Sequence, residues 1–197
     1  MGTVLVIYAS DYGHTKRAAA EVALGVERVV GTNVRLRSAA EVTREDVLDA
    51  DGLILGSPVH MGSIHWELKR FIDETLSALW NQDLMVGRVG GVFATGGGYG
   101  GAGGGCELAM LSMLATLAEL GMVIVPLPKC TESYAHGGLH WGPYARCGSD
   151  ELSHTPPPAE SLPLLMAHGQ NVARVVSQLS PQTAGRIARP SFTSPQT

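Results

Sequence analysis

The chain has 197 residues, of which 45% are hydrophobic and 16% charged, and its formal net charge is −4 at pH 7. This length fits one domain that buries about 70% of its unfolded surface. The sequence contains no basic run, which argues against nucleic acid as a main ligand. No apolar run reaches about 18 residues, so no membrane span is expected. The N-terminus lacks the basic segment of a signal peptide, so we expect a cytoplasmic protein.

Short apolar segments alternate with helical patterns along the chain. Five strands are predicted, at residues 4–8, 34–37, 53–55, 90–94 and 122–125. Helices are predicted at residues 14–30, 44–50, 64–80, 107–120 and 159–179. This alternation predicts an α/β fold, with a doubly wound, five-stranded parallel sheet and helices on both faces. Residues 1–180 form the expected domain, and the tail at 181–197, rich in Pro, Ser and Thr, is expected to be disordered.

Two helix starts carry capping signals. Thr43, with Asp46 three residues later, predicts a variant of the capping box at the helix 44–50. Ser63 is expected to cap the helix 64–80. The long segment at 129–158 has no regular period and is predicted to be a functional loop.

The loop after the first strand, Ser10–Thr15, has the features of an anion site. It joins a buried strand to a helix N-terminus, where unpaired N–H groups and the helix dipole favour phosphate. No Lys or Arg precedes Lys16, so backbone groups and the hydroxyls of Ser10 and Thr15 are expected to hold the anion. The loop lacks the patterns of a P-loop NTPase and of an NAD-type Rossmann fold. Ser57 stands where a phosphate-transfer receiver domain has Asp, and the first loop lacks the Cys of a phosphatase.

Two further loops follow the third and fourth strands. The loop at 56–62 contains few charges, and the loop at 94–105 is rich in glycine, which lets backbone approach a flat ligand closely. In a parallel sheet these loops meet the first one at the carboxyl ends of the strands. One phosphate site with two backbone-lined walls fits a planar ring joined to a single phosphate, and FMN is the natural candidate.

Several motifs in this order resemble one family. They are the Ser-Asp-Tyr-Gly-His run at 10–14, the loop at 56–62, Leu-Trp at 79–80, residues 93–101, and the runs at 116–118 and 121–126. Together they resemble the WrbA-type NAD(P)H:quinone oxidoreductases, which are flavodoxin-like FMN enzymes. The resemblance covers residues 4–126, and residues 137–144 less closely. The chain departs from the family at His60 and Met61, where Arg-Phe is usual, at Leu120, where His is frequent, in the shorter segment 38–51, and in a longer glycine loop.

The resemblance implies a set of site residues. FMN phosphate is expected at Ser10, Asp11, Tyr12, Gly13, His14 and Thr15. The flavin ring is expected against Pro58, Val59, His60, Met61 and Gly62, and against Thr95, Gly96, Gly97, Gly98, Tyr99, Gly100 and Gly101. Nicotinamide or quinone is expected near Tyr12 and Trp80, and the aromatic segment with His140 and Trp141 is expected to line a substrate mouth or a subunit contact.

The sequence therefore predicts an FMN-dependent NAD(P)H:quinone oxidoreductase that uses NADPH or NADH and works by two-electron, ping-pong hydride transfer. The flavin would carry the chemistry, so no catalytic side chain is expected. A flavodoxin-type electron carrier, an NAD(P)H-dependent flavin reductase and a binding module without chemistry are the alternatives. The resemblance implies a homodimer or homotetramer. No metal is expected, because the spacing of Cys130, His136, His140 and Cys147 matches no standard zinc pattern.

Overall fold

The computed structural model spans the whole chain, and the structure describes residues 1–98, 103–149 and 153–179. The strands of this described part are β1 (Gly2–Tyr8), β2 (Thr32–Ser38), β3 (Gly52–Pro58), β4 (Val89–Gly96), β5 (Val123–Ile124), β6 (Gly138–Leu139) and β7 (Gly142–Arg146). The helices are α1 (His14–Glu27), α2 (Arg44–Leu48), α3 (Trp66–Phe71), η1 (Ile72–Leu76), α4 (Ser77–Trp80), α5 (Cys106–Glu119), η3 (Tyr134–His136), η4 (Ala159–Ser161) and α6 (Leu162–Leu179). The predicted tail at 181–197 lies outside the described residues.

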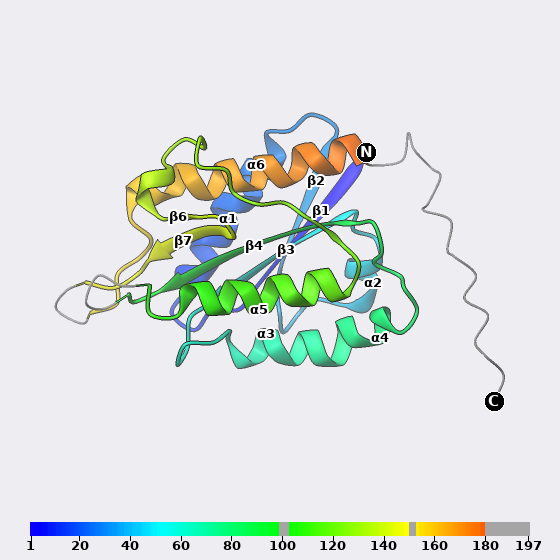
Figure 1. Ribbon diagram of the computed structural model, residues 1–197, viewed down its shortest axis with the longest axis horizontal. Helices are drawn as coiled ribbons and strands as arrows, with labels where there is room; N and C mark the ends of the chain where they lie inside the picture. Colours follow the sequence, from blue (N-terminus) through cyan, green and yellow to red (C-terminus); the bar gives the residue numbers. More distant parts are fainter. Residues whose placement is uncertain (99–102, 150–152, 180–197) are drawn as a thin grey trace.

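The strands form one mostly parallel sheet in the order β2-β1-β3-β4-β7-β6, with β5 also paired to β4. β1 runs parallel to β2 and β3, and β4 runs parallel to β3, β5 and β7. Only β6 is antiparallel, in a short ladder with β7. The structure therefore confirms the predicted α/β fold, with a doubly wound parallel sheet between two layers of helices (Figure 1).

The sequence predicts a single fifth strand at 122–125. The structure instead has a two-residue strand, β5, and a separate strand, β7, on the same side of β4. β5 pairs only with the start of β4, at Val89 and Gly90. The chain then leaves the sheet at Pro126, which has no N–H to donate to a ladder. It returns as β7, which pairs with the end of β4 from Ala94 to Gly96. The segment predicted as an irregular loop thus supplies part of the sheet.

Alternating side chains of the strands supply two cores. Leu5 and Ile7 of β1 pack in the cluster beneath α3, α4 and α5, whereas Val4 and Val6 pack in the cluster beneath α1 and α6. Figure 1 shows these two helix layers on opposite sides of the sheet. Because the period along a strand is two, each central strand is apolar on both sides, as a covered parallel sheet requires.

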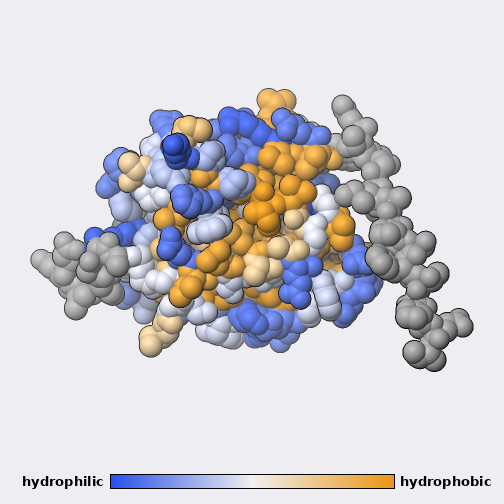
Figure 2. Space-filling view, viewed as in Figure 1, coloured by the Kyte–Doolittle hydropathy of each residue, from blue (hydrophilic) through white to orange (hydrophobic). Residues whose placement is uncertain are grey.

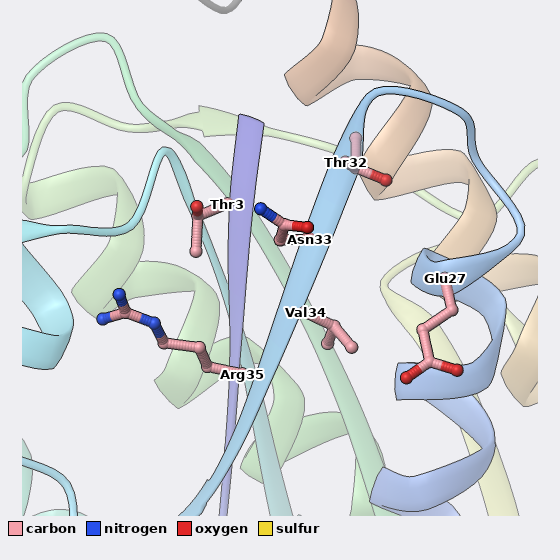
Figure 3. Close-up of a pocket in the computed structure, with 6 residues that line it drawn as sticks. All are labelled: Thr3, Glu27, Thr32, Asn33, Val34 and Arg35. Carbon is pink, nitrogen blue, oxygen red and sulfur yellow. The ribbon is translucent and has the colours of Figure 1, made fainter. Parts of the chain in front are cut away.

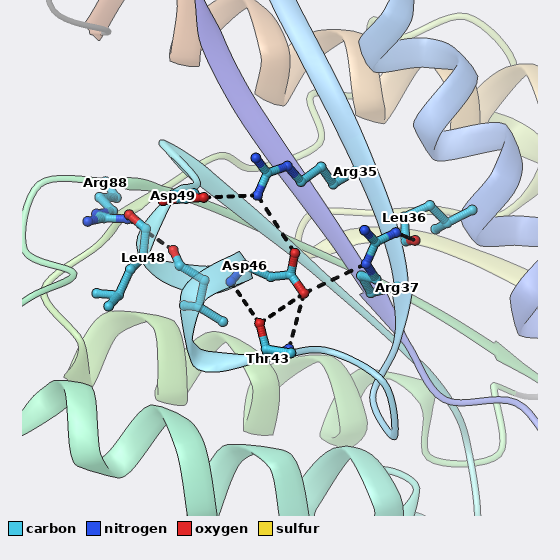
Figure 4. Close-up of polar contacts among 9 residues, drawn as sticks. Arg35, Leu36, Arg37, Thr43, Asp46, Leu48, Asp49 and Arg88 are labelled. Atoms are coloured by element: carbon cyan, nitrogen blue, oxygen red, sulfur yellow. Dashed lines mark hydrogen bonds and ion pairs between the residues drawn. The ribbon is translucent and has the colours of Figure 1, made fainter.

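The short helix α2 is fixed by polar contacts at both ends (Figure 4). At its start, Thr43 and Asp46 form the predicted capping box, which the structure confirms. Arg35 and Arg37 of β2 also reach the Asp46 carboxylate, at 3.7 Å each. At its end, Arg88 donates to the backbone carbonyls of residues 47, 48 and 50. These contacts hold five helical residues that are too few to be stable alone.

The helix expected at 64–80 begins two residues later than predicted. His65, not Ser63, occupies the N-cap position, and its side chain accepts from the backbone N–H of Glu67. Ser63 is instead paired with His60 in a tight turn. The helix then runs from α3 through one π-helical segment, η1, into α4. The backbone N–H of His65 donates to Ser57 Oγ at 2.8 Å, so His65 lies near the end of β3, at the edge of the sheet where ligands are expected.

The outer surface of α5 is unusually apolar. Leu108 and Leu111 of this helix are exposed, although its other face packs in the core. Figure 2 shows a band of apolar side chains across this side of the molecule. The homodimer or homotetramer expected from the sequence stays a prediction.

None of the described helices combines the length and apolarity that crossing a bilayer requires.

Candidate functional site

A cavity of about 380 Å³ lies at the carboxyl ends of β1, β3 and β4. This volume falls in the range of small-molecule sites, and the position is the one where parallel sheets bind ligands. The residues that line the cavity come from the loops after β1, β3 and β4 and from the segment after β7. They are Ser10, Asp11, Tyr12, His14, Thr15, Pro58, Val59, His60, Met61, Thr95, Gly96, Gly97, Cys147 and His154.

The N-terminus of α1 opens into this cavity without a side-chain cap. The N-cap residue is Gly13, in the left-handed conformation with φ 81°, so no side chain satisfies the first N–H groups of the helix. Ser10 Oγ and His14 Nε2 are also buried without a hydrogen-bond partner. Burial, with a contribution from His154, lowers the pKa of His14. Unpartnered donors at a helix N-terminus form a site for an anion.

A pair of threonines joins this loop to the end of β4. Thr15 Oγ1 and Thr95 Oγ1 lie 2.7 Å apart, and each residue is 1% exposed. One hydroxyl donates to the other. The pair fixes the start of α1 against the end of β4. The anion site and the glycine-rich segment after β4 therefore keep a fixed relative position.

The second wall is a tight turn at His60–Ser63. The backbone N–H of His60 donates to the Ser63 carbonyl, and the reverse bond is also present, both at 2.9 Å. Met61 and Gly62, the two central residues, have positive φ of 49° and 77°. Such a turn is typical of a rigid hairpin, and a positive φ at Met61 is strained. The turn places the Met61 side chain fully in solvent at the mouth of the cavity.

The turn also packs on the N-cap of α5. A Cβ added at Gly105, which has φ 96°, would lie 2.7 Å from Gly62 Cα. Only glycine fits such a contact, so this approach ties the second loop to the end of the glycine-rich segment.

Three polar side chains meet beside the first and second loops. His65 Nε2 lies 3.1 Å from both carboxylate oxygens of Asp11, and His60 Nε2 lies 3.4 Å from Asp11 Oδ2. His65 Nδ1 accepts the N–H of Glu67, so Nε2 carries the proton and donates to Asp11. A metal ion would need the free lone pair of Nε2, and therefore would break the cap of α3. The cluster is a hydrogen-bonded network.

The third wall is formed by β4 and by the returning segment after β7. The backbone N–H of Cys147 donates to the Gly96 carbonyl at 2.7 Å, and Tyr144 Oη donates to the same carbonyl at 3.0 Å. Burial raises the pKa of the Cys147 thiol to about 12, so it is protonated at neutral pH. Gly96 and Gly97 line the cavity and have no side chains of their own, so this wall presents backbone to a flat ligand.

Cys147 and His154 are lining residues that the sequence did not predict. The ring of His154 stacks on Tyr12, with centroids 4.2 Å apart and planes 24° apart. Both residues belong to the segment that follows β7, whose return to the sheet no local pattern indicates.

Most of the predicted cofactor residues do line the cavity. Gly13, Gly62 and Gly98 shape the loops but do not line it. Tyr99, Gly100 and Gly101 lie outside the described residues. Of the four predicted substrate residues, only Tyr12 lines the cavity.

Trp80, His140 and Trp141 lie outside the cavity of the single chain. Trp80 ends α4, and the helix from α3 to α4 is about 22 Å long at about 1.5 Å per residue, so it carries Trp80 away from the carboxyl ends of the strands. Trp141 packs against the core beneath α5 instead. A substrate role for these three residues stays a prediction.

A second hollow, of about 410 Å³, lies at the amino ends of β1 and β2 (Figure 3). Its two charged residues, Glu27 and Arg35, lie apart in the picture. Arg35 also pairs with Asp49 at 3.2 Å. This hollow therefore offers no convergent set of groups for a ligand.

The donors of the first cavity fit one phosphate monoester. Ser10 Oγ and His14 Nε2 lack partners, and the start of α1 lacks a cap. The backbone of Gly96 and Gly97 lines the same cavity, where the flat ring of FMN would lie.

Comparisons with known proteins point to flavodoxins, which fits a cavity at the carboxyl ends of a parallel sheet. Residues 5–95 match the flavodoxin domain family. A protein named flavodoxin from Aquifex aeolicus (strain VF5) is 44% identical over 124 residues, which span 63% of this chain and 64% of that relative.

Solved structures show the same fold. The crystal structure of the flavodoxin, WrbA-like protein from Agrobacterium tumefaciens has a TM-score of 0.66 and 24% identity, covering 90% of this chain and 99% of the other. A flavodoxin from the domain Archaea has a TM-score of 0.63 and 20% identity, covering 89% and 99%. The chain therefore has the flavodoxin-like fold, and its residues 5–95 match the flavodoxin domain family.

Proposed function

We propose that the chain is an FMN-binding electron-transfer protein of the flavodoxin type. The observation that carries this proposal is the uncapped start of α1 with the unpartnered Ser10 Oγ and His14 Nε2, beside a cavity walled by two further loops. These groups would donate to the phosphate of FMN. The turn at His60–Ser63 and the backbone at Gly96 and Gly97 would flank its ring. Bound FMN would supply the redox chemistry.

Two findings favour an electron carrier over the quinone reductase that the sequence predicts. The relative at 44% identity is named flavodoxin. In addition, Trp80, His140 and Trp141, which the reductase was expected to use for its substrate, do not reach the cavity of the single chain.

An FMN-dependent NAD(P)H:quinone oxidoreductase is the second candidate, and one observation favours it. Tyr12 is 64% exposed at the cavity wall, and it presents a flat aromatic surface. Nicotinamide and quinone rings stack on such surfaces. NADPH or NADH would then be the reductant.

The purified protein tests both candidates. We expect released cofactor, or cofactor titrated into the stripped protein, to be FMN bound one to one, with FAD bound weakly. We expect a redox titration with two resolved one-electron steps, and NADH or NADPH oxidation no faster than with free FMN. Oxidation that depends on added benzoquinone would establish the second candidate, and oxidation that depends on added free flavin would indicate a flavin reductase. Failure to bind FMN would refute the proposal.

A further inference from the structure

The lining of the cavity has an unusual charge balance for an anion site. Among its described lining residues there is no Lys or Arg, and Asp11 is the one carboxylate. The other side chains of the lining that can become cationic are three histidines, His14, His60 and His154. A ligand that carries a phosphate dianion would therefore enter beside a negative charge, with only imidazoles available to balance it.

The position of Asp11 is fixed by a buried partner. His65 is 2% exposed and donates from Nε2 to the Asp11 carboxylate at 3.1 Å. Its Nδ1 is occupied by the N–H of Glu67, and its own backbone N–H donates to Ser57 Oγ at 2.8 Å. Because His65 is held at three points in its neutral form, it orients Asp11 without neutralising it.

His60 faces the same carboxylate from the cavity side. Its Nε2 lies 3.4 Å from Asp11 Oδ2, and its side chain is 39% exposed. The two backbone hydrogen bonds with Ser63 fix the residue in the turn. The His60 and His65 rings meet edge to face, with centroids 5.0 Å apart. His60 thus holds a solvent-accessible imidazole beside the Asp11 carboxylate, on a backbone fixed by the turn.

We propose that His60 is the proton-linked group of the cavity, taking up a proton from solvent when a phosphate-bearing ligand binds beside Asp11. The inference rests on the proposed FMN site and adds its regulation by pH. The added negative charge of the phosphate favours the imidazolium of His60, which pairs with Asp11 and makes that wall neutral. Affinity then falls as the pH rises, because a proton must be taken up at lower proton concentration.

The other titratable groups around the cavity are less suited to this role. His14 has its pKa lowered by burial and by His154, so it resists protonation. His154 is stacked on Tyr12. Cys147 stays protonated, and Arg146 donates from Nε to the Gly97 carbonyl at 3.3 Å. Among the described residues, His60 and His65 have ring nitrogens within 3.4 Å of the Asp11 carboxylate, and His65 already donates its Nε2 proton there.

The test is the pH dependence of FMN binding to the stripped protein. One proton taken up weakens binding by up to about tenfold for each pH unit. We expect the Kd for FMN to rise at least about tenfold between pH 6.5 and 8.5 in the parent protein. In His60→Gln, which keeps an amide donor for Asp11 but cannot titrate, we expect a rise of less than about threefold. Calorimetry at pH 7.5 in HEPES and in Tris should show proton uptake in the parent and not in His60→Gln.

Matched variants decide between the histidines. His136→Gln, at an exposed position outside the cavity, should behave as the parent. Asp11→Asn keeps an acceptor for His65, and it should bind FMN more tightly at pH 8.5 with a smaller pH dependence. An unchanged slope in His60→Gln, or a slope lost only in His14→Gln or His154→Gln, would overturn this inference while leaving FMN binding intact. Absence of FMN binding at every pH would overturn the proposed function as well.

Discussion

The hydroxyl pair Thr15–Thr95 allows a quantitative test of how the site is held together. Both residues are 1% exposed, and their Oγ1 atoms lie 2.7 Å apart. Thr95→Val keeps the shape of the side chain but leaves the Thr15 hydroxyl buried without its partner. An unsatisfied buried group costs about 1–3 kcal/mol, and we expect a loss of stability in this range from either single change.

The double variant Thr15→Val with Thr95→Val should recover most of that loss. Replacing both partners by apolar groups of the same shape is nearly neutral, so the coupling between the two positions should approach the sum of the two single losses, about 2–6 kcal/mol. Urea unfolding of the FMN-free protein measures the four free energies without a contribution from ligand. Thr116→Val, on the outer part of α5, is the control and should change stability by less than about 0.5 kcal/mol. Additive losses in the double variant would refute the interpretation that the two hydroxyls stabilise each other.

Three further predictions use the same assays. Burial lowers the pKa of His168 from 6.5 to about 4, so the unfolded chain binds the extra proton between these values. Stability should therefore fall by up to about 3 kcal/mol as the pH drops through this window, and urea unfolding of His168→Leu should show a flatter profile. Ser10→Asp should weaken FMN binding by at least about tenfold through repulsion, measured by fluorescence titration, whereas Ser10→Ala should lose less. Trp141→Ala should reduce stability by about 2–3 kcal/mol with unchanged FMN content, because the ring packs on the core; lost FMN would place it at the site instead.

The first half of the sheet was predictable because its signals are local. The apolar run at 4–8, the loop at 10–15 and the helix that follows are contiguous, and each carries its own pattern. The capping box of Thr43 and Asp46 is equally local, since all its atoms lie within four residues. These elements place the anion site without any knowledge of the rest of the chain.

The returning strand β7 could not be predicted in this way. Its place beside β4 depends on a close approach over a long sequence separation. A Cβ added at Gly142 would lie 2.1 Å from the Val92 carbonyl oxygen, so only glycine allows the contact. Cys147 and His154 reach the cavity only because of this pairing. The register that decides their place is a property of the assembled sheet, and no period in the sequence encodes it.

The N-cap of α3 shows a different limit. Serine is a preferred N-cap residue, and histidine is not, so Ser63 is the expected choice. The structure uses Ser63 to close the turn with His60 and gives the cap to His65. This arrangement also lets His65 donate to Asp11, which is a long-range contact that the local rule does not include.

The stack of His154 on Tyr12 bears on the choice between carrier and reductase. An aromatic ring has two faces, and His154 covers one face of Tyr12 at 4.2 Å between centroids. If the flavin ring stacks on the other face, neither face remains for nicotinamide or quinone. A reductase would then need the Tyr12–His154 pair to separate, or a second copy of the chain to supply the substrate surface. A carrier needs neither, because its partner only has to approach the edge of the ring. The stack therefore favours electron transfer at the exposed edge, and His154→Ala is the change that would open Tyr12 to a substrate.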